Sequence, residues 1–248
     1  MPAATIDEVI GQLEIIVQDA SSVGDPLGIF AGVYLGVTRD VKSGIQERKF
    51  EDGALMERLD VVFANRYLEA LSQYKNSEPC TQSWKIAFEA AQNQDFLILQ
   101  HLLLGINAHI NLDLGIAAAA CVDARRVLEL ERDFMSINSV LAAKIDAVQD
   151  RLSAVSPLLF LLDWAGQRKD ERFAEFSLIK ARDQAWQLAV ALSRQNENQQ
   201  TVRIEAQDLA VAALGKLISH PGKWIGWLFK LIRFFEKKDA RRVIAVLQ

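Results

Sequence analysis

The chain has 248 residues, of which half are hydrophobic and 24% are charged. This composition is typical of a soluble globular protein that is long enough to bury a substantial core. The formal net charge of −4 gives no general attraction to nucleic acid, so we predict no nucleic-acid partner. Acidic residues among the first twenty argue against a signal peptide, and the two cysteines do not form a CxxC pair. We therefore expect a cytoplasmic protein.

Apolar residues recur at helical intervals along the chain, and the alternation expected of strands is nearly absent. The pattern predicts an all-α single domain of about nine to eleven helices. Thr5 and Glu8 have the spacing of a capping box and start the first helix, which ends near the turn at 21–26. Further helices are expected at about 27–42, 53–74, 84–91, 96–122, 136–155, 173–195, 205–219, 223–238 and 240–248.

The longest apolar run, residues 96–122, is expected to be a buried helix around which the other helices pack. It is interrupted by polar residues, namely His101, Asn107, His109, Asn111 and Asp113. Burying such groups without partners costs several kcal/mol, so other side chains or a ligand must satisfy them. This run is therefore the best functional clue in the sequence.

Helical geometry places His101, Gly105, His109 and Asp113 on one face of this helix. His109 and Asp113 are four residues apart, a spacing from which both can bind one metal ion. Gly105 leaves a notch that a ligand or a neighbouring helix can approach. The face predicts either a metal or small-molecule site or a buried polar network that joins helices without chemistry.

Two further carboxylates are candidate metal ligands. Asp60 lies beside the aromatic positions of its helix and either turns inward or is solvated at the edge of the apolar stripe. Asp163 follows five apolar residues and either points inward or lies at a helix end facing water. A divalent metal such as zinc, held by His109, Asp113, Asp60 and Asp163, would be the cofactor, with His101 as general base or neighbouring partner.

The segment 223–238 combines aromatic and basic residues with few other polar ones. Such a helix can lie on an anionic membrane surface, or it can close the core or a dimer interface while its lysines reach outward. We therefore consider a homodimer or a peripheral membrane contact through Trp224, Trp227 and Phe229, with the segment either packed on the domain or exposed.

The sequence HLLLGINAHINLDLG, at 101–115, resembles the signature of a bacterial family that is defined only as a domain of unknown function. The similarity extends to 50–71, 133–138 and 182–186. The resemblance implies a helical fold and carries no established activity.

The His109-x-x-x-Asp113 pair is also similar to one ligand motif of the helical zinc-dependent phospholipase C and nuclease families. The chain has only three histidines and no HxxxE pair, so it cannot assemble the full trinuclear site that this likeness implies.

Two functions remain open. One is a metal-dependent hydrolase-like or small-ligand-binding protein that uses His101, His109 and Asp113. The other is a non-enzymatic interaction or membrane-surface protein in which the polar cluster is structural.

Overall fold

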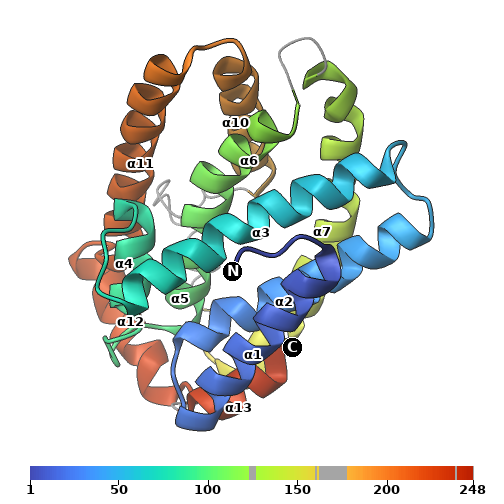
Figure 1. Ribbon diagram of the computed structural model, residues 1–248. Helices are drawn as coiled ribbons and strands as arrows, with labels where there is room; N and C mark the ends of the chain where they lie inside the picture. The colour runs from blue at the N-terminus through green and yellow to red at the C-terminus, as the bar shows by residue number, and fades with distance from the viewer. Residues whose placement is uncertain (123–126, 160, 162–177, 238, 248) are drawn as a thin grey trace.

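The computed structural model describes residues 1–122, 127–159, 161, 178–237 and 239–247. Within these ranges the chain is all α, with eleven α-helices, one π-helix and no β-strand, which confirms the predicted fold class (Figure 1). The helices are α1 Ile6–Val23, α2 Leu27–Gln46, α3 Gly53–Lys75, α4 Gln82–Ala90, α5 Ile98–Ala108, η1 His109–Asp113, α6 Leu114–Cys121, α7 Val127–Val155, α10 Leu178–Ser193, α11 Glu197–Ser219, α12 Lys223–Phe235 and α13 Ala240–Leu247.

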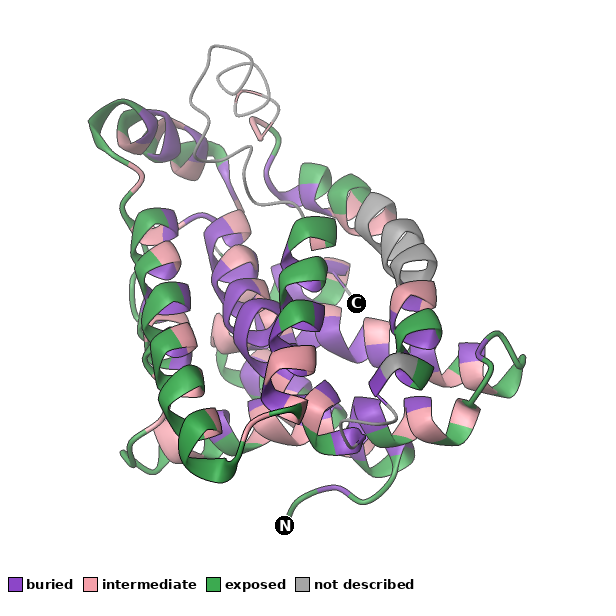
Figure 2. Cartoon of the chain, turned by 90° about the horizontal axis from the view of Figure 1, so that it is seen from above, coloured by how far each residue is buried: buried purple, intermediate pink, exposed green. Residues whose placement is uncertain are grey.

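The predicted central helix is present as the continuous run of α5, η1 and α6. Its neighbours in space are α2, α3, α4, α10 and α11. By length and composition Ile98–Cys121 is apolar enough to cross a membrane, but 72% of its most apolar window is buried inside the protein. The apolar run is therefore explained by enclosure within the helical domain, since buried residues face inward and exposed residues lie on the outer sides of the helices (Figure 2).

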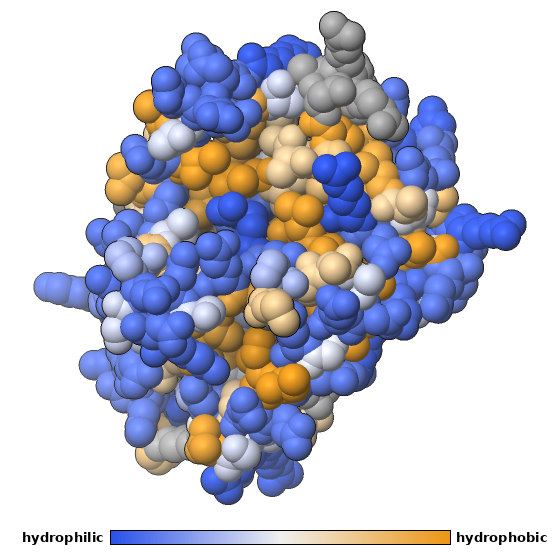
Figure 3. Space-filling model, in the orientation of Figure 1, coloured by the Kyte–Doolittle hydropathy of each residue, from blue (hydrophilic) through white to orange (hydrophobic). Residues whose placement is uncertain are grey.

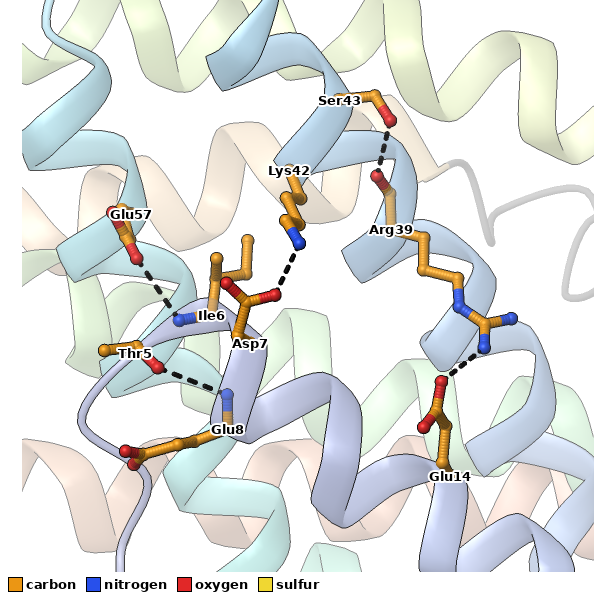
Figure 4. Close-up of polar contacts among 9 residues, drawn as sticks. All are labelled: Thr5, Ile6, Asp7, Glu8, Glu14, Arg39, Lys42, Ser43 and Glu57. Carbon is orange, nitrogen blue, oxygen red and sulfur yellow. Dashed lines mark hydrogen bonds and ion pairs between the residues drawn. The ribbon is translucent and has the colours of Figure 1, made fainter.

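The N-terminal helix begins as the capping pattern predicts. Thr5 Oγ1 accepts a hydrogen bond from the backbone N–H of Glu8 at 3.2 Å (Figure 4). Across the α1–α2 pair, Asp7 forms an ion pair with Lys42, and a second exposed ion pair lies further along the two helices. Exposed pairs contribute only about 0–1 kcal/mol each, so apolar packing is what mainly holds α1 on α2.

Carboxylates from distant parts of the chain cap the N-termini of α4 and α5, and a third distant carboxylate binds the turn just before α3. Asp133 accepts from the two backbone N–H groups just before α3, both at 2.8 Å. Asp208 accepts from the first two N–H groups of α4, at 2.7 and 2.9 Å. Glu236 accepts from the first N–H of α5, at 3.2 Å. Each carboxylate is buried and satisfies N–H groups that a helix cannot satisfy itself.

The start predicted for the helix that ends at Val155 was wrong. The helix α7 begins at Val127, so Ser136 lies inside it, where its hydroxyl donates to the Arg132 carbonyl instead of capping a new helix. A serine can bond the carbonyl four residues back, and this leaves the helix continuous.

The helix α12 packs with one side only. Its side chains Ile225, Leu228, Phe229 and Ile232 form a small apolar cluster with Leu97. Phe229, which we expected to contact a partner, lies inside this cluster, whereas Trp224 and Trp227 are exposed. On the face of the molecule seen in Figure 3, apolar side chains gather in the upper half among hydrophilic ones. Exposed apolar side chains are therefore not confined to α12.

The contact between α6 and α10 depends on a glycine. A Cβ at Gly115 would lie 2.7 Å from the Ala185 carbonyl oxygen and about 3 Å from Leu188. Because the nearest atom belongs to the backbone, the two helices would have to separate. We expect Gly115→Ala to destabilise the protein by about 1–3 kcal/mol, as measured by urea denaturation.

A matched control is Gly11→Ala in α1, where a Cβ meets nothing within 4 Å. There the higher helix propensity of alanine is expected to stabilise the protein by up to about 1 kcal/mol. Equal effects of the two substitutions would contradict the close approach at Gly115.

Candidate functional site

The centre of the buried helix departs from α-helical geometry at the two predicted ligands. In η1, His109–Asp113, the hydrogen bonds run five residues back, and the Leu114 N–H donates to the His109 carbonyl. A π-turn holds an extra residue and so changes the angle between side chains at its ends. Such turns occur often at functional sites. The sequence pattern predicted a regular α-helix and missed this turn.

An aromatic cage encloses the ring of His109. The ring stacks on Phe63 with centroids 3.6 Å apart and planes 7° apart, and Tyr34 approaches its edge at 4.5 Å. Phe30, Tyr67 and Trp84 complete the cage. Burial lowers the pKa of His109 in spite of the nearby carboxylate of Asp113, so the ring is neutral at pH 7.

Neither ring nitrogen of His109 has a good hydrogen bond to a described residue. Nδ1 lies 3.5 Å from Asp113 Oδ2, at the outer limit for such a bond. The cage leaves the imidazole held by ring contacts, with its polar atoms unsatisfied. This is uncommon for a buried side chain, because an unpaired polar group there costs about 1–3 kcal/mol.

Asp113 is the most fully bonded member of the cluster. Its Oδ1 accepts from Arg66 Nε and its Oδ2 from Trp84 Nε1, both at 2.7 Å. The carboxylate is buried, while the arginine side chain is 28% exposed and reaches the surface. Neither Trp84 nor Arg66 was a predicted site residue. Asp113 lies 29 residues from Trp84 and 47 from Arg66 in the sequence, so helical spacing could not reveal these contacts.

These contacts bear on the predicted metal site. Arg66 places a positive charge against the carboxylate that would have to bind the ion, and the indole N–H takes its other oxygen. In the part of the chain that the structure describes, no three His, Cys, Asp or Glu side chains gather as an ion requires. Asp163 lies outside the described residues. The metal site therefore remains a prediction, and the described donors do not fit it.

Asp60 turns inward, the first of the two alternatives for this residue. The residue is 7% exposed, and no described residue donates a hydrogen bond to its Oδ2. Burial, helped by the negative charge of Glu57, raises the pKa of Asp60 to about 7. Tyr34 is also buried, and no described residue forms a hydrogen bond with its hydroxyl, while Thr38 donates to its backbone carbonyl. Two polar groups near the cage are thus unsatisfied.

His101 does not join His109 and Asp113; it faces a separate cleft. This cleft has a volume of about 360 Å³ and lies between the α1–α2 turn, the loop after α4, and α12. His101 and Arg233 line it together with the polar loop at 92–95. Burial and the nearby Arg233 lower the pKa of His101 to about 4, so its imidazole is neutral at pH 7.

A narrow recess lies next to the cleft. It is lined by aromatic side chains that include Phe30, Tyr67, Trp84 and Phe88, and it shares Pro26, Ala91 and His101 with the cleft. Its volume is about 20 Å³, enough for about one water molecule. The notch expected at Gly105 is filled here, since a Cβ would lie 2.5 Å from the Phe30 ring.

The two asparagines of the central helix have a structural role. Asn107 Nδ2 donates to the Val211 carbonyl of α11 at 2.9 Å, and Asn111 Nδ2 donates to Asn107 Oδ1 at 2.9 Å. Gln207 of α11 donates to the Asn111 carbonyl. These bonds tie the central helix to α11. His101 takes no part in them and lines the cleft instead.

The fold and the site define a helical protein in which a buried His–Asp–Trp cluster, bonded to an arginine that reaches the surface, lies next to a solvent-accessible cleft. The chain belongs to a family of unknown function (DUF5995), which it matches over residues 6–221. No curated protein and no solved structure matches the chain, so the likeness to zinc-dependent phospholipases and nucleases stays a prediction. The family match ends before α12 and α13 begin.

Proposed function

We propose that the protein binds a small molecule in the cleft at His101. The observation that carries this proposal is the position of His101, which lines both the 360 Å³ cleft and the aromatic recess behind it. The cleft volume falls within the range of about 300–1,000 Å³ that is usual for ligand sites. No described residue hydrogen-bonds to the His101 ring, which leaves its nitrogens available to a ligand.

The lining suggests the chemistry of the ligand. The polar side chains of residues 92–95 line the cleft, and Arg233 lies beside them. Arg233 is held by the Gln94 carbonyl at 2.8 Å and by Glu236 at 3.2 Å, so its guanidinium is fixed in place. Next to these polar groups lies the aromatic recess. A polar molecule with a small apolar end fits this arrangement.

A metal-dependent hydrolase is the less favoured form of the proposal. It needs an ion at His109 and Asp113, and the carboxylate oxygens of Asp113 already bind Arg66 and Trp84. The neutral His101 can instead donate or accept one hydrogen bond to a ligand without any ion. Metal analysis of the untagged protein separates the two forms, and we expect no stoichiometric zinc, manganese or iron.

Binding is tested by saturation-transfer NMR with a set of fragment-sized aromatic amides and carboxylates. We expect His101→Leu to weaken the bound fragments by at least about fivefold, the value of one lost hydrogen bond. Ala240→Trp, which places a large ring in the cleft, is expected to abolish binding.

Two control variants keep the test specific. His220→Gln removes an exposed imidazole, and Ala206→Trp adds an indole to an exposed position of α11. Neither residue lines the cleft, so both variants are expected to bind as the wild type does. Fragments that bind equally well to the His101 and Ala240 variants, or a set in which none binds, would overturn the proposal.

A further inference from the structure

The outer face of α12 is apolar where the surface of a globular protein is usually polar. Trp224, Trp227, Phe234 and Phe235 are 53–73% exposed, while the opposite side of the helix is buried against Leu97. The helix is therefore apolar on both sides, and only one of them is covered. Helices that are hydrophobic all round are normally enclosed, but among the described residues no other helix covers the outer aromatic face.

The charges on this face all have one sign. Lys223 and Lys230 are exposed beside the aromatic residues. The one acidic residue between 223 and 237 is Glu236, which is buried and bonded to the backbone of Ile98 and to Arg233. The outer face of α12 thus presents aromatic rings and ammonium groups with no carboxylate, on a chain whose net charge is −4.

Viewed along the helix at 100° per residue, Lys230 and Lys223 border one edge of the exposed arc. Phe234 and Trp227 lie at its centre, and Trp224 lies toward the other edge. This is the arrangement of a helix lying in the plane of a membrane, with rings at the boundary between headgroups and acyl chains and lysines among the phosphates.

We propose that α12 binds the surface of membranes that contain anionic phospholipids. A second copy of the chain is a poorer partner, because a two-fold contact through this face would bring Lys223 and Lys230 of both copies together. Anionic headgroups neutralise the same lysines while the rings enter the apolar layer. The family match ends at residue 221, so this surface lies outside the matched part of the chain.

Anchoring within the protein keeps α12 in place for such binding. Glu236 at its end caps α5, and Arg233 donates to the Gln94 carbonyl. The Lys237 N–H donates to the Val155 carbonyl at 2.9 Å. With these bonds on its inner side, the helix can meet a membrane by its outer side without leaving the protein.

The proposal is tested by flotation of the full-length protein with vesicles of phosphatidylglycerol and phosphatidylcholine, and with vesicles of phosphatidylcholine alone. We expect flotation with the anionic vesicles and a blue shift of tryptophan fluorescence. Replacing both Trp224 and Trp227 by serine is expected to lower the bound fraction at least about tenfold. Lys223→Glu combined with Lys230→Glu is expected to abolish the preference for anionic lipid.

The matched control replaces Val202 and Leu209 by serine. These residues of α11 are 67% and 64% exposed, so the control removes a similar number of exposed apolar side chains from another helix. It is expected to float as the wild type does. Equal flotation of the tryptophan variant would overturn the proposal. So would failure of the wild type to float with the anionic vesicles, and a dimer in sedimentation equilibrium that the tryptophan variant loses would then identify a second copy of the chain as the occupant of this face.

Discussion

Asp113→Ala is expected to lower the free energy of unfolding by about 3–5 kcal/mol, the usual effect of removing one partner from a buried ion pair. The substitution leaves the Trp84 N–H buried without an acceptor, which alone costs about 1–3 kcal/mol. Arg66 loses its carboxylate too, although its side chain is 28% exposed and can reach water. We therefore expect the lower end of this range in urea denaturation.

Asp7→Ala is the matched control, since it removes a carboxylate from an exposed ion pair with Lys42. Its effect is expected to stay within about 1 kcal/mol. Asp113→Asn, which keeps one acceptor oxygen for Arg66 or Trp84, should fall between the two alanine variants. If Asp113→Ala were as mild as Asp7→Ala, the carboxylate would not hold α3 and α4 to the central helix.

The second large effect that we expect is a pH dependence of the free energy of unfolding caused by Asp60. The pKa of this carboxyl is about 7 in the folded protein against an ordinary value of 3.8. The folded state therefore holds the proton more tightly than the unfolded state does. The resulting stabilisation is fully present below pH 4 and is lost as the pH rises to about 7. Each tenfold change in proton affinity corresponds to about 1.4 kcal/mol, so the full loss is about 4 kcal/mol.

Comparison with Asp60→Asn isolates this contribution, because asparagine has the same shape and does not titrate. The stability of the wild type relative to the variant is expected to fall between pH 4 and pH 7 and to level off above that. Urea denaturation at half-unit pH intervals measures it. A difference that does not change with pH would mean that Asp60 ionises freely in the folded protein.

His101 provides a comparison of opposite sign. Its pKa of about 4 lies below the ordinary 6.5, so the unfolded state binds the proton more tightly. The wild type is therefore expected to lose stability relative to His101→Gln as the pH falls from about 6.5 to 4. In the wild type the two trends partly cancel between pH 4 and 6.5, which is why the single variants are needed to see either one.

The helical class and the central helix could be predicted because they depend on local periodicity. The apolar run that becomes Ile98–Cys121 is visible in the sequence, and so is the Thr5 cap, whose partner is three residues away. Asn107 was also expected to need a partner, because an amide inside an apolar run is costly to bury unpaired. In each case a short stretch of sequence shows the residue pattern and also the physical reason for the structure that it forms.

The candidate site could be predicted only in part. His109 and Asp113 were identified, but their surroundings come from α2, α3 and α4, and helical spacing does not say which helices will meet. The π-turn that orients both side chains leaves no simple sequence pattern. His101 was placed on the face of His109, yet it lines the cleft and the recess, whereas Phe30, which also lines the recess, packs against the His109 ring.

The distant caps of α4 and α5 have a consequence for how the protein is made. A ribosome releases the chain from the N-terminus, and domains generally fold as units as they emerge. Asp208 follows the first residue of α4 by 126 positions, and Glu236 follows Ile98 by 138. In the growing chain, the N–H groups at the start of α4 and α5 therefore have no carboxylate partner until most of the chain has been synthesised. The central helices can be capped only after α11 and the residues after α12 have been translated. A polypeptide that ends earlier lacks the carboxylates that cap α4 and α5.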